Sequence, residues 1–447
     1  MASTYLIRSL GASETSTQKG TFSWWLKRAS ITAAYNFYFN EVTDDNNRGY
    51  IQMNTSAQLR MIDNDISTTF INLVTNRLFR DTSAWYHIVI AIDTTQATAS
   101  DRVKVYVNGV QETSFATETY PSQNANLKIL EGGQTNKNVI GAGYPTTSGF
   151  LDGSIAHFHY TDGTQYQASD FGETDATTGI WKPKTAPSVT YGNNGFFLKF
   201  ENSGAFGTDS SGNANNFTVN GTMTQTIDTP SNVFATFNPL VKVWSGDTTL
   251  SNGNTTVTNS AALDGSPPTT IGATSGKYYW EMKQENANDV FIGVCGDGFV
   301  SDNLYNNYSG ITSNATTGLL VYNSSGDKVV NGSTSSSFFT SYGSGDIIGI
   351  ALDLDSATKT VTFYKNGVVD SAGAQNLPTN MQSGAVFGVA IVDDSATVSA
   401  NFGNGYFGTT AVSSAQNPDD GIGIFEYAVP SGYKALCTKS INAQEYD

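Results

Sequence analysis

Carboxylate pairs are the first residues whose spacing could do chemistry. A retaining glycosidase needs two carboxyl groups about 5–5.5 Å apart, which on a strand requires acidic residues at even spacing on one face. The chain offers Glu281 with Glu285, and Asp353 with Asp355. The first pair is expected at the end of a strand and the second in a hairpin turn, and no Glu-x-Asp-x-Glu run occurs. We therefore expect both pairs to be structural and predict that the protein is not an enzyme.

Three histidines could form a metal site if their strands were neighbours. His157 and His159 share a strand face at i, i+2, and His87 lies in another predicted strand. Phe158 between the first two indicates that one face of this strand is buried, so we favour histidines of the core over metal ligands. A Ser-His-Asp triad can be drawn from any chain this rich in Ser and has no weight here.

Cofactor motifs are present only in part. Gly403–Gly408 fits G-x-G-x-x-G, but no helical pattern follows it, so it is interpreted as a glycine-rich strand end. Asp44–Gly49 begins like a calcium loop, yet its twelfth position is Thr55 instead of a bidentate Glu. We predict no cofactor, and a Ca²⁺ site of another kind stays open. Cys295 and Cys437 lie in apolar stretches and are predicted to be buried free thiols.

The elements expected to position these residues show the period-two alternation of apolar and polar residues that is typical of β-strands. Arg102–Val110 and Thr360–Val368 alternate apolar and polar residues, and each ends in the Asn-Gly pair of a type I′ hairpin. Each is preceded by an apolar strand that ends in an acidic residue, Asp93 and Asp353 respectively. One such unit in each half of the chain predicts an all-β protein with two related sandwiches.

Composition excludes several classes of function. The chain has 447 residues, with 23 Lys+Arg against 39 Asp+Glu, a net charge of −16, and no basic run. This excludes the electrostatic footprint of a nucleic-acid binder, and an anionic membrane surface would repel the chain. No stretch approaches 18 apolar residues, so we expect no membrane insertion. Met1–Arg8 lacks the apolar segment of a signal peptide, so synthesis in a cytoplasm is expected.

Turn-forming residues mark the boundary between the two halves. Gly, Ser and Asn accumulate between residues 204 and 232, just after the apolar run Gly195–Phe200. We predict a first sandwich over 1–203, a Gly/Ser/Asn-rich connector over 204–238, and a second sandwich over 239–447.

Each half resembles a known domain family. The first resembles laminin-G-like, concanavalin A-like domains, in Gly20–Lys27, Trp85–Val89, Val103–Gly109 and Phe150–Ala156. The second is similar to SPRY domains, in Gly276–Glu281, Ile347–Asp353 and Thr362–Gly367. The resemblance implies two concanavalin A-like antiparallel β-sandwich (jelly-roll) domains. Because that fold also hosts β-glucanases, a β-glucanase-like carbohydrate-active enzyme is kept as the third alternative.

Other stretches are similar to tailed-bacteriophage proteins, above all those of marine phages. They are Asp170–Glu173, Thr178–Lys184, Asp209–Asn216 and Tyr427–Thr438. The resemblance implies a non-enzymatic virion structural protein at the virion surface, a tail fibre or similar appendage used in host-surface glycan recognition or adsorption. The alternative is a capsid decoration, head-fibre or tail adaptor protein that binds only other virion proteins. A homo-oligomer is implied as well, with the trimer as the common state of fibres.

One loop has the composition of an adaptable recognition surface. Residues 301–310 follow an apolar strand and mix Tyr, Asn, Ser and Gly. Tyrosine supplies contact area at low entropy cost, and Asn supplies hydrogen bonds. Tyr305, Asn306 and Tyr308 are our candidates for contact with a glycan or partner protein. The alternative, a polar turn whose tyrosines pack back on the sandwich, stays open.

Overall fold

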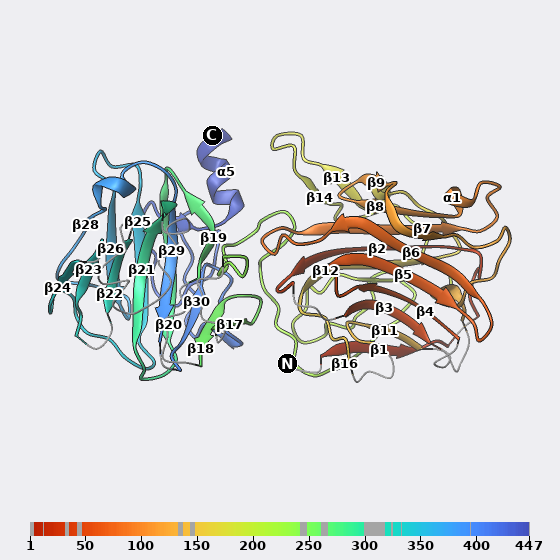
Figure 1. Ribbon diagram of the computed structural model, residues 1–447, viewed down its shortest axis with the longest axis horizontal. Coiled ribbons are helices and arrows are strands. Elements are labelled where there is room, and N and C mark those ends of the chain that lie inside the picture. Colours follow the sequence, from red (N-terminus) through yellow and green to blue (C-terminus); the bar gives the residue numbers. More distant parts are fainter. Residues whose placement is uncertain are drawn as a thin grey trace. The chain divides into compact units, whose positions relative to one another are not determined.

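The computed structural model divides into two compact units, Met1–Gln225 and Thr226–Asp447 (Figure 1). It describes residues 4–11, 13–31, 35–42, 47–132, 137–143, 148–241, 248–260, 267–298, 318–322, 325–331, 333–393 and 395–446. Strands make up 46% of the chain and helices 5%, which confirms the predicted all-β class. Among the residues described, no helix is long and apolar enough to cross a membrane.

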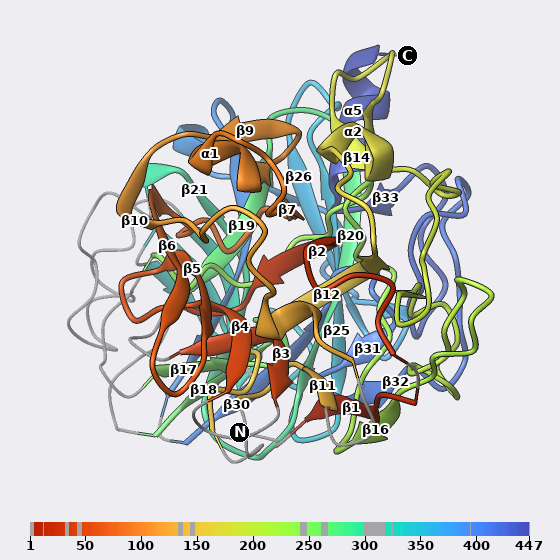
Figure 2. The same ribbon diagram turned by 90° about the vertical axis from the view of Figure 1, so that its right-hand side faces the viewer.

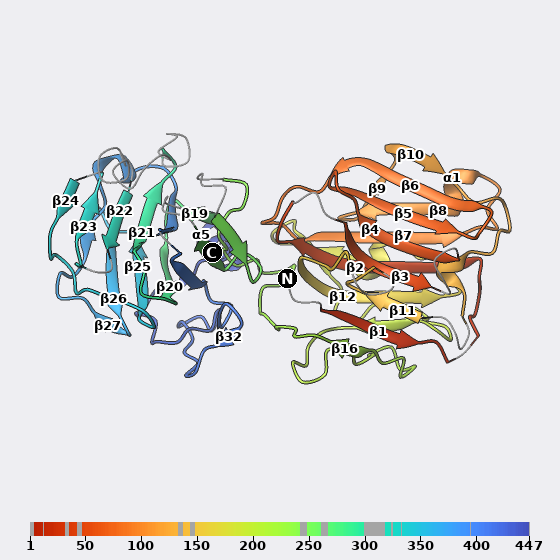
Figure 3. The ribbon, with the colours of Figure 1, turned by 60° about the horizontal axis from the view of Figure 1, so that its bottom comes forward.

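The first unit is a sandwich of two antiparallel sheets. Figure 3 shows its larger sheet, which runs from β10 at one edge to β16 at the other. In spatial order this sheet contains β10 (Phe115–Thr119), β6 (Thr69–Leu78), β5 (Gln58–Asn64), β4 (Arg48–Met53), β3 (Asn36–Val42), β11 (Lys137–Ile140), β1 (Tyr5–Ser9) and β16 (Thr218–Asn220). The six-stranded sheet contains β15 (Phe196–Leu198), β12 (Gly153–Asp162), β2 (Lys19–Arg28), β7 (Tyr86–Asp93), β8 (Val103–Val107) and β9 (Val110–Glu112).

The second unit repeats this plan. Its larger sheet contains β17 (Thr248–Ser251), β18 (Thr256–Asn259), β30 (Thr397–Asn401), β20 (Lys277–Gln284), β25 (Ile347–Asp353), β26 (Thr360–Lys365) and β27 (Val368–Val369), with β28 (Gln375–Asn376) beside β26 and β33 (Lys434–Ala435) beside β20. Its smaller sheet contains β19 (Pro268–Ala273), β29 (Val386–Val392), β21 (Val290–Gly296), β22 (Gly318–Tyr322), β23 (Lys328–Val330) and β24 (Ser333–Ser335).

Short elements complete the chain. The first unit also contains α1 (Ala99–Arg102), η1 (Lys128–Leu130), α2 (Ala168–Phe171), β13 (Gly172–Thr174) and β14 (Trp181–Pro183). The second contains η2 (Thr379–Met381), β31 (Tyr406–Phe407), β32 (Thr410–Ala411) and α5 (Thr438–Tyr446). Strand β16 comes from the stretch 204–238 expected as connector, yet it pairs with β1 and so belongs to the first sandwich.

Alternation along the strands separates the core from the outer faces, as period-two patterns require. In β2, Phe22, Trp24 and Leu26 belong to the core of the first unit, whereas Ser23 and Trp25 point to the opposite side of the sheet. Each unit has its own apolar core of aromatic and branched side chains.

A later segment of the chain covers the outer face of one sheet in each unit. In the first, residues 165–191 pack Phe171 and Trp181 near Val89 of the six-stranded sheet. In the second, residues 403–437 pack Phe425 near Tyr279 of the larger sheet. We call these the first and second covers. In the first unit, β3 to β6 of the eight-stranded sheet lie side by side in Figure 2.

Candidate functional site

The predicted contact loop lies outside the described part of the chain. Tyr305, Asn306 and Tyr308 lie outside the described residues, as do Asp44 to Asn46 of the candidate calcium loop. Among the described residues, no group of three His, Cys, Asp or Glu side chains is arranged to hold a metal ion.

His87 is a buried structural residue with both ring nitrogens engaged. Trp181 Nε1 donates to His87 Nδ1 at 3.0 Å, and Ser23 Oγ lies 2.9 Å from His87 Nε2. An indole N–H can only donate, so Nδ1 accepts and the neutral ring carries its proton on Nε2. Burial lowers the pKa of His87 to about 3. Because Nε2–H donates to Ser23, His87 cannot serve as the general base for that hydroxyl.

His159 is equally enclosed. Its Nδ1 lies 2.9 Å from the hydroxyl of Tyr191, and its ring stacks on Phe197 with centroids 3.9 Å apart. Burial lowers its pKa well below the ordinary value. His157 contacts it edge to face. The three histidines therefore belong to the packing between the six-stranded sheet and its neighbours.

The carboxylates of the two candidate pairs make structural contacts, mostly with backbone amides. Glu281 is buried in β20 and accepts the amides of Glu426 and Tyr427 in the second cover, at 2.9 Å each. Glu285 pairs with Lys283 at 2.9 Å. Asp353 caps the turn that follows β25 by accepting the amides of residues 355 and 356. Asp355 accepts the amide of Gly276 at 2.6 Å.

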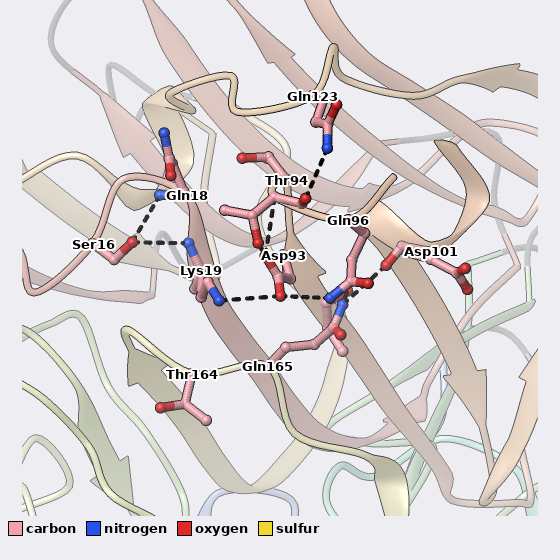
Figure 4. A network of polar contacts seen from close by, with 12 residues as sticks. Ser16, Gln18, Lys19, Asp93, Thr94, Gln96, Asp101, Gln123, Thr164 and Gln165 are labelled. Carbon is pink, nitrogen blue, oxygen red and sulfur yellow. Dashed lines mark hydrogen bonds and ion pairs between the residues drawn. The ribbon is translucent and has the colours of Figure 1, made fainter. Parts of the chain in front are cut away.

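A similar network surrounds Asp93 at the end of β7 (Figure 4). Lys19 Nζ lies 3.3 Å from Asp93 Oδ2, and Gln96 Nε2 donates to the same oxygen at 2.8 Å. Thr95 donates its amide and its hydroxyl to Oδ1. Gln165 of the first cover ties the region together by donating to the carbonyls of residues 91 and 101. These groups satisfy one another, so the network positions a turn and leaves no oxygen directed at a ligand.

The glycine motif and the cysteines also have structural roles. Asn401 Oδ1 accepts the amides of Gly403 and Gly405 at 3.0 and 3.1 Å, so these donors are not available to cradle a phosphate. Cys295 and Cys437 are free and buried, as predicted. Burial raises the pKa of both thiols.

Polar side chains of a different kind lie on the outer face of the eight-stranded sheet. Gln52 of β4 is opposite Arg60 of β5, and Tyr50 is in register with Ile62, which in turn is opposite Asn72 of β6. Residues on either side of these positions, such as Ile51, Met61 and Leu73, face the core. We call the set Arg48, Tyr50, Gln52, Arg60 and Asn72 the polar face.

Four members of the polar face bury a polar atom that has no partner. They are Arg48 Nε, Gln52 Oε1, Arg60 Nε and Asn72 Oδ1. The Gln52 side chain is 2% exposed although it points away from the core. A buried polar group without a hydrogen bond costs about 1–3 kcal/mol, and native proteins keep few of them. Four such atoms lie on three adjacent strands, where the half-buried side chains of Arg48, Tyr50, Arg60 and Asn72 are partly open to solvent.

An aromatic ring lies among these groups. The Arg48 guanidinium carbon lies 5.4 Å from the centroid of the Tyr50 ring, and Phe37 of β3 meets that ring edge to face at 5.5 Å. Cross-strand neighbours on one face of a sheet have Cβ atoms about 4.5–5.5 Å apart, so Gln52 and Arg60 are within reach of one molecule. The polar face thus combines a flat apolar surface with planar guanidinium and amide groups.

The sequence carries only a weak signal for this site. Arg48, Tyr50 and Gln52 alternate with apolar residues or glycine, and Arg60 follows the same rule in the next strand. Polar residues at the outward positions of neighbouring strands are also common on ordinary solvated sheets. Only the packing shows that their polar atoms are buried and unpaired.

Comparison with known proteins bears out both domain resemblances. Residues 7–164 match the model of the concanavalin A-like lectin/glucanases superfamily, and residues 277–405 match that of the SPRY domain. No curated protein matches the sequence. The polar face lies within the first matched stretch.

Three solved SPRY structures are similar to part of the chain. The SPRY domain of human HERC1 is 19% identical, with 37% of this chain and 96% of that chain covered, at a TM-score of 0.29. The TRIM65 PSpry domain is 19% identical, with 37% and 88% covered, at 0.28. A human SPRY domain is 17% identical, with 35% and 96% covered, at 0.27.

Proposed function

We propose that this chain, a concanavalin A-like domain followed by a SPRY domain, is a non-enzymatic binding protein whose first domain holds carbohydrate on the polar face. The observation that carries the proposal is the group of half-buried polar side chains Arg48, Arg60 and Asn72 beside the Tyr50 ring.

Carbohydrate fits this surface because its hydroxyls both donate and accept. They can accept hydrogen bonds from the guanidinium groups of Arg48 and Arg60. The apolar face of a sugar ring can lie on the Tyr50 ring.

The distribution of carboxylates favours binding over hydrolysis. On the strands that carry the polar face, Asp63 points inward and accepts the amides of Lys128 and Ile129 at 3.1 and 2.7 Å. Glu41 of β3 is buried and in register with Gly49 and Asp63, on the inner face. Neither carboxylate faces the position proposed for a sugar, where an acid and a nucleophile would be needed.

The setting that we propose is the surface of a phage virion. It rests on the similarity of Asp170–Glu173, Thr178–Lys184, Asp209–Asn216 and Tyr427–Thr438 to tailed-phage proteins. In that setting the first domain binds host-surface glycans, the protein self-associates in an appendage, and other virion proteins are its partners. The alternative is a decoration or adaptor protein whose partners are all virion proteins. Locating the chain in an imaged particle decides between them.

Titration of the full-length protein against a glycan array, followed by calorimetry on the hits, tests carbohydrate binding. We expect Tyr50→Ala to weaken binding about tenfold or more, since it removes a direct contact. Arg80→Gln, which changes an exposed arginine outside the polar face, is the control and should bind like the unmodified protein. If no glycan binds, or if Tyr50→Ala binds unchanged while the melting temperature is kept, the proposal is wrong.

A further inference from the structure

We infer that the saccharide bound by the polar face is acidic, and that Arg48 and Arg60 hold its carboxylate or sulfate groups. The inference deepens the proposed function and rests on it. It starts from the state of the arginines in the first domain.

All seven arginines of the chain lie in the first unit. Four of them have defined partners. Arg77 pairs with Glu112 at 2.7 Å, Arg8 binds Asn138, and Arg28 and Arg102 donate to backbone carbonyls. Arg80 is exposed to solvent.

Arg48 and Arg60 differ from these. Both are half-buried, and each hides its Nε atom without a partner as Arg28 does, but neither has the backbone acceptor that binds another nitrogen of the Arg28 guanidinium. With the residues that the structure describes, Arg60 forms neither a hydrogen bond nor an ion pair, and the Arg48 guanidinium interacts with the Tyr50 ring alone. The chain has 39 acidic residues against 23 basic ones, so a carboxylate partner would be easy to supply.

The described carboxylates around this sheet have other contacts. Glu118 of β10 accepts the hydroxyl of Tyr120, and Glu112 pairs with Arg77. Asp65, in the turn after β5, accepts the amides of residues 67 and 68. Asp63 points to the core. Both guanidinium groups therefore present a positive charge to whatever the polar face binds.

A neutral sugar would cover these charges without compensating them. Removing a cation from water with no counter-charge is costly, whereas a guanidinium binds carboxylate or sulfate oxygens through two parallel charge-assisted hydrogen bonds. Arg48 lies on one side of Gln52 along β4, and Arg60 lies across from Gln52 on β5. An oligosaccharide across Tyr50 and Gln52 can thus meet a cation at each side.

Calorimetry on the full-length protein tests this with matched ligands. The carboxylate arm compares oligogalacturonate with its carboxyl-reduced counterpart, and the sulfate arm compares a carrageenan oligosaccharide with its desulfated counterpart. We expect the acidic member of at least one pair to bind about tenfold more tightly than the neutral one, with an advantage that shrinks in high salt. The arm that shows the preference identifies the anionic group.

Variants separate this inference from the proposed function. Arg60→Gln and Arg48→Gln should each remove most of the acidic preference, because each should weaken binding of the acidic member more than binding of the neutral one. Arg80→Gln should change neither, and melting temperatures confirm that every variant is folded. Equal binding of acidic and neutral members would overturn the inference and leave carbohydrate binding in place. An acidic preference that survives both substitutions would also overturn it, and binding of neither member in both arms would count against both proposals.

Discussion

The two sandwiches share the same stabilising contacts around their hairpin turns, and they differ in charge and in unpaired polar groups. In both, a lysine at the start of one strand pairs with an aspartate at the end of the neighbouring strand of the sheet. The pairs are Lys19 with Asp93 and Lys277 with Asp353. In both, an Asn-Gly turn follows. Asn108 exchanges hydrogen bonds with the backbone of His87, and Asn366 does the same with Ile347.

Each cover packs against the hairpin turn of its own domain in a similar way. Gly109 and Gly367 have φ angles of +82° and +78°. A Cβ on Gly109 would lie 3.1 Å from the Trp181 ring, and one on Gly367 would lie 2.6 Å from Tyr427. Each cover thus places an aromatic ring on the glycine of the hairpin turn, which only a residue without a side chain permits at this distance and backbone angle.

The difference lies in charge and in unpaired polar groups. The first unit has 15 basic and 19 acidic residues, a net charge of −4, whereas the second has 8 and 20, a net charge of −12 and no arginine. Four buried unpaired atoms of the first unit lie on the adjacent strands β4 to β6, besides others such as Trp24 Nε1, Arg28 Nε and Tyr38 Oη. Those of the second are, among the residues described, single atoms of Thr248, Trp280, Gln284 and Asn404. The polar face is therefore a property of one domain and does not follow from the shared sandwich plan.

The largest expected effect tests whether the two cores are independent. Trp24 and Trp280 are fully buried at the centres of the two cores. Trp280→Ala should destabilise the second domain by about 3–5 kcal/mol and leave the first unfolding transition in place. Trp24→Ala should do the reverse, as measured by calorimetry. A shift of both transitions by either variant would contradict independent cores.

The next effect is a pH dependence that both domains should share. Asp63 holds two consecutive amides of η1, and Glu281 holds two of the second cover. Burial raises the pKa of both carboxyls to about 7. The unfolded Glu281 ionises near 4.5 while the folded group keeps its proton, so stability should fall as pH rises from about 4.5 to about 7.

The size of this effect follows from the difference in pKa. For Glu281 it amounts to about 3 kcal/mol over that window. Chemical denaturation at pH 5 and pH 8 measures it, with Glu281→Gln flattening the slope of the second transition and Asp63→Asn that of the first. A slope that persists in Glu281→Gln would assign the pH dependence to other groups.

Local chemistry explains how much of the fold can be predicted. Period-two alternation and Asn-Gly turns act within a few residues, so the strands around Asn108 and Asn366 are predicted correctly from sequence alone. The covers are not, because Trp181 meets His87 across 94 positions of sequence. Composition predicts a connector over 204–238, yet Val219 within it pairs with Leu6.

The candidate site is harder to predict for a related reason. The polar face depends on which residues of β4, β5 and β6 lie opposite one another, and the register shifts between Gln58 and Arg60 and again between Asp63 and Asn64. Such irregularities change which side chains share a face. The loop proposed from its composition, with Tyr305 and Tyr308, lies outside the described residues, and its role stays a prediction.

A smaller effect on stability is expected at the two Lys–Asp ion pairs. Burial by itself would raise the pKa of Asp93 and Asp353, but their hydrogen bonds and the lysine ammonium groups lower it below the ordinary value. Asp93→Ala and Asp353→Ala should each cost about 2 kcal/mol at pH 7, because several donors lose their acceptor. The loss should shrink as pH falls below about 4, because these carboxylates then protonate in the unfolded chain while the native ones, with their lower pKa, stay charged.

The lysines serve as controls for that comparison. Lys19→Ala and Lys277→Ala should each cost less than about 1 kcal/mol, since their ammonium groups are partly exposed. Equal losses for lysine and aspartate variants would show that the ion pair, rather than the turn that the carboxylate caps, carries the stability.

The smallest effect has opposite signs in the two domains. Gln52 Oε1 is buried without a partner, so Gln52→Leu should raise the free energy of unfolding of the first domain by about 1 kcal/mol. Gln382 of the second domain is the matched control, because its side chain accepts the amide of Lys359 and donates to the carbonyl of Leu377 at 2.7 Å. Gln382→Leu should therefore lower stability by about 1 kcal/mol or more. Denaturant titration of the full-length variants resolves both changes, and a loss of stability in Gln52→Leu would mean that this amide is satisfied in the folded protein and that the polar face is ordinary packing.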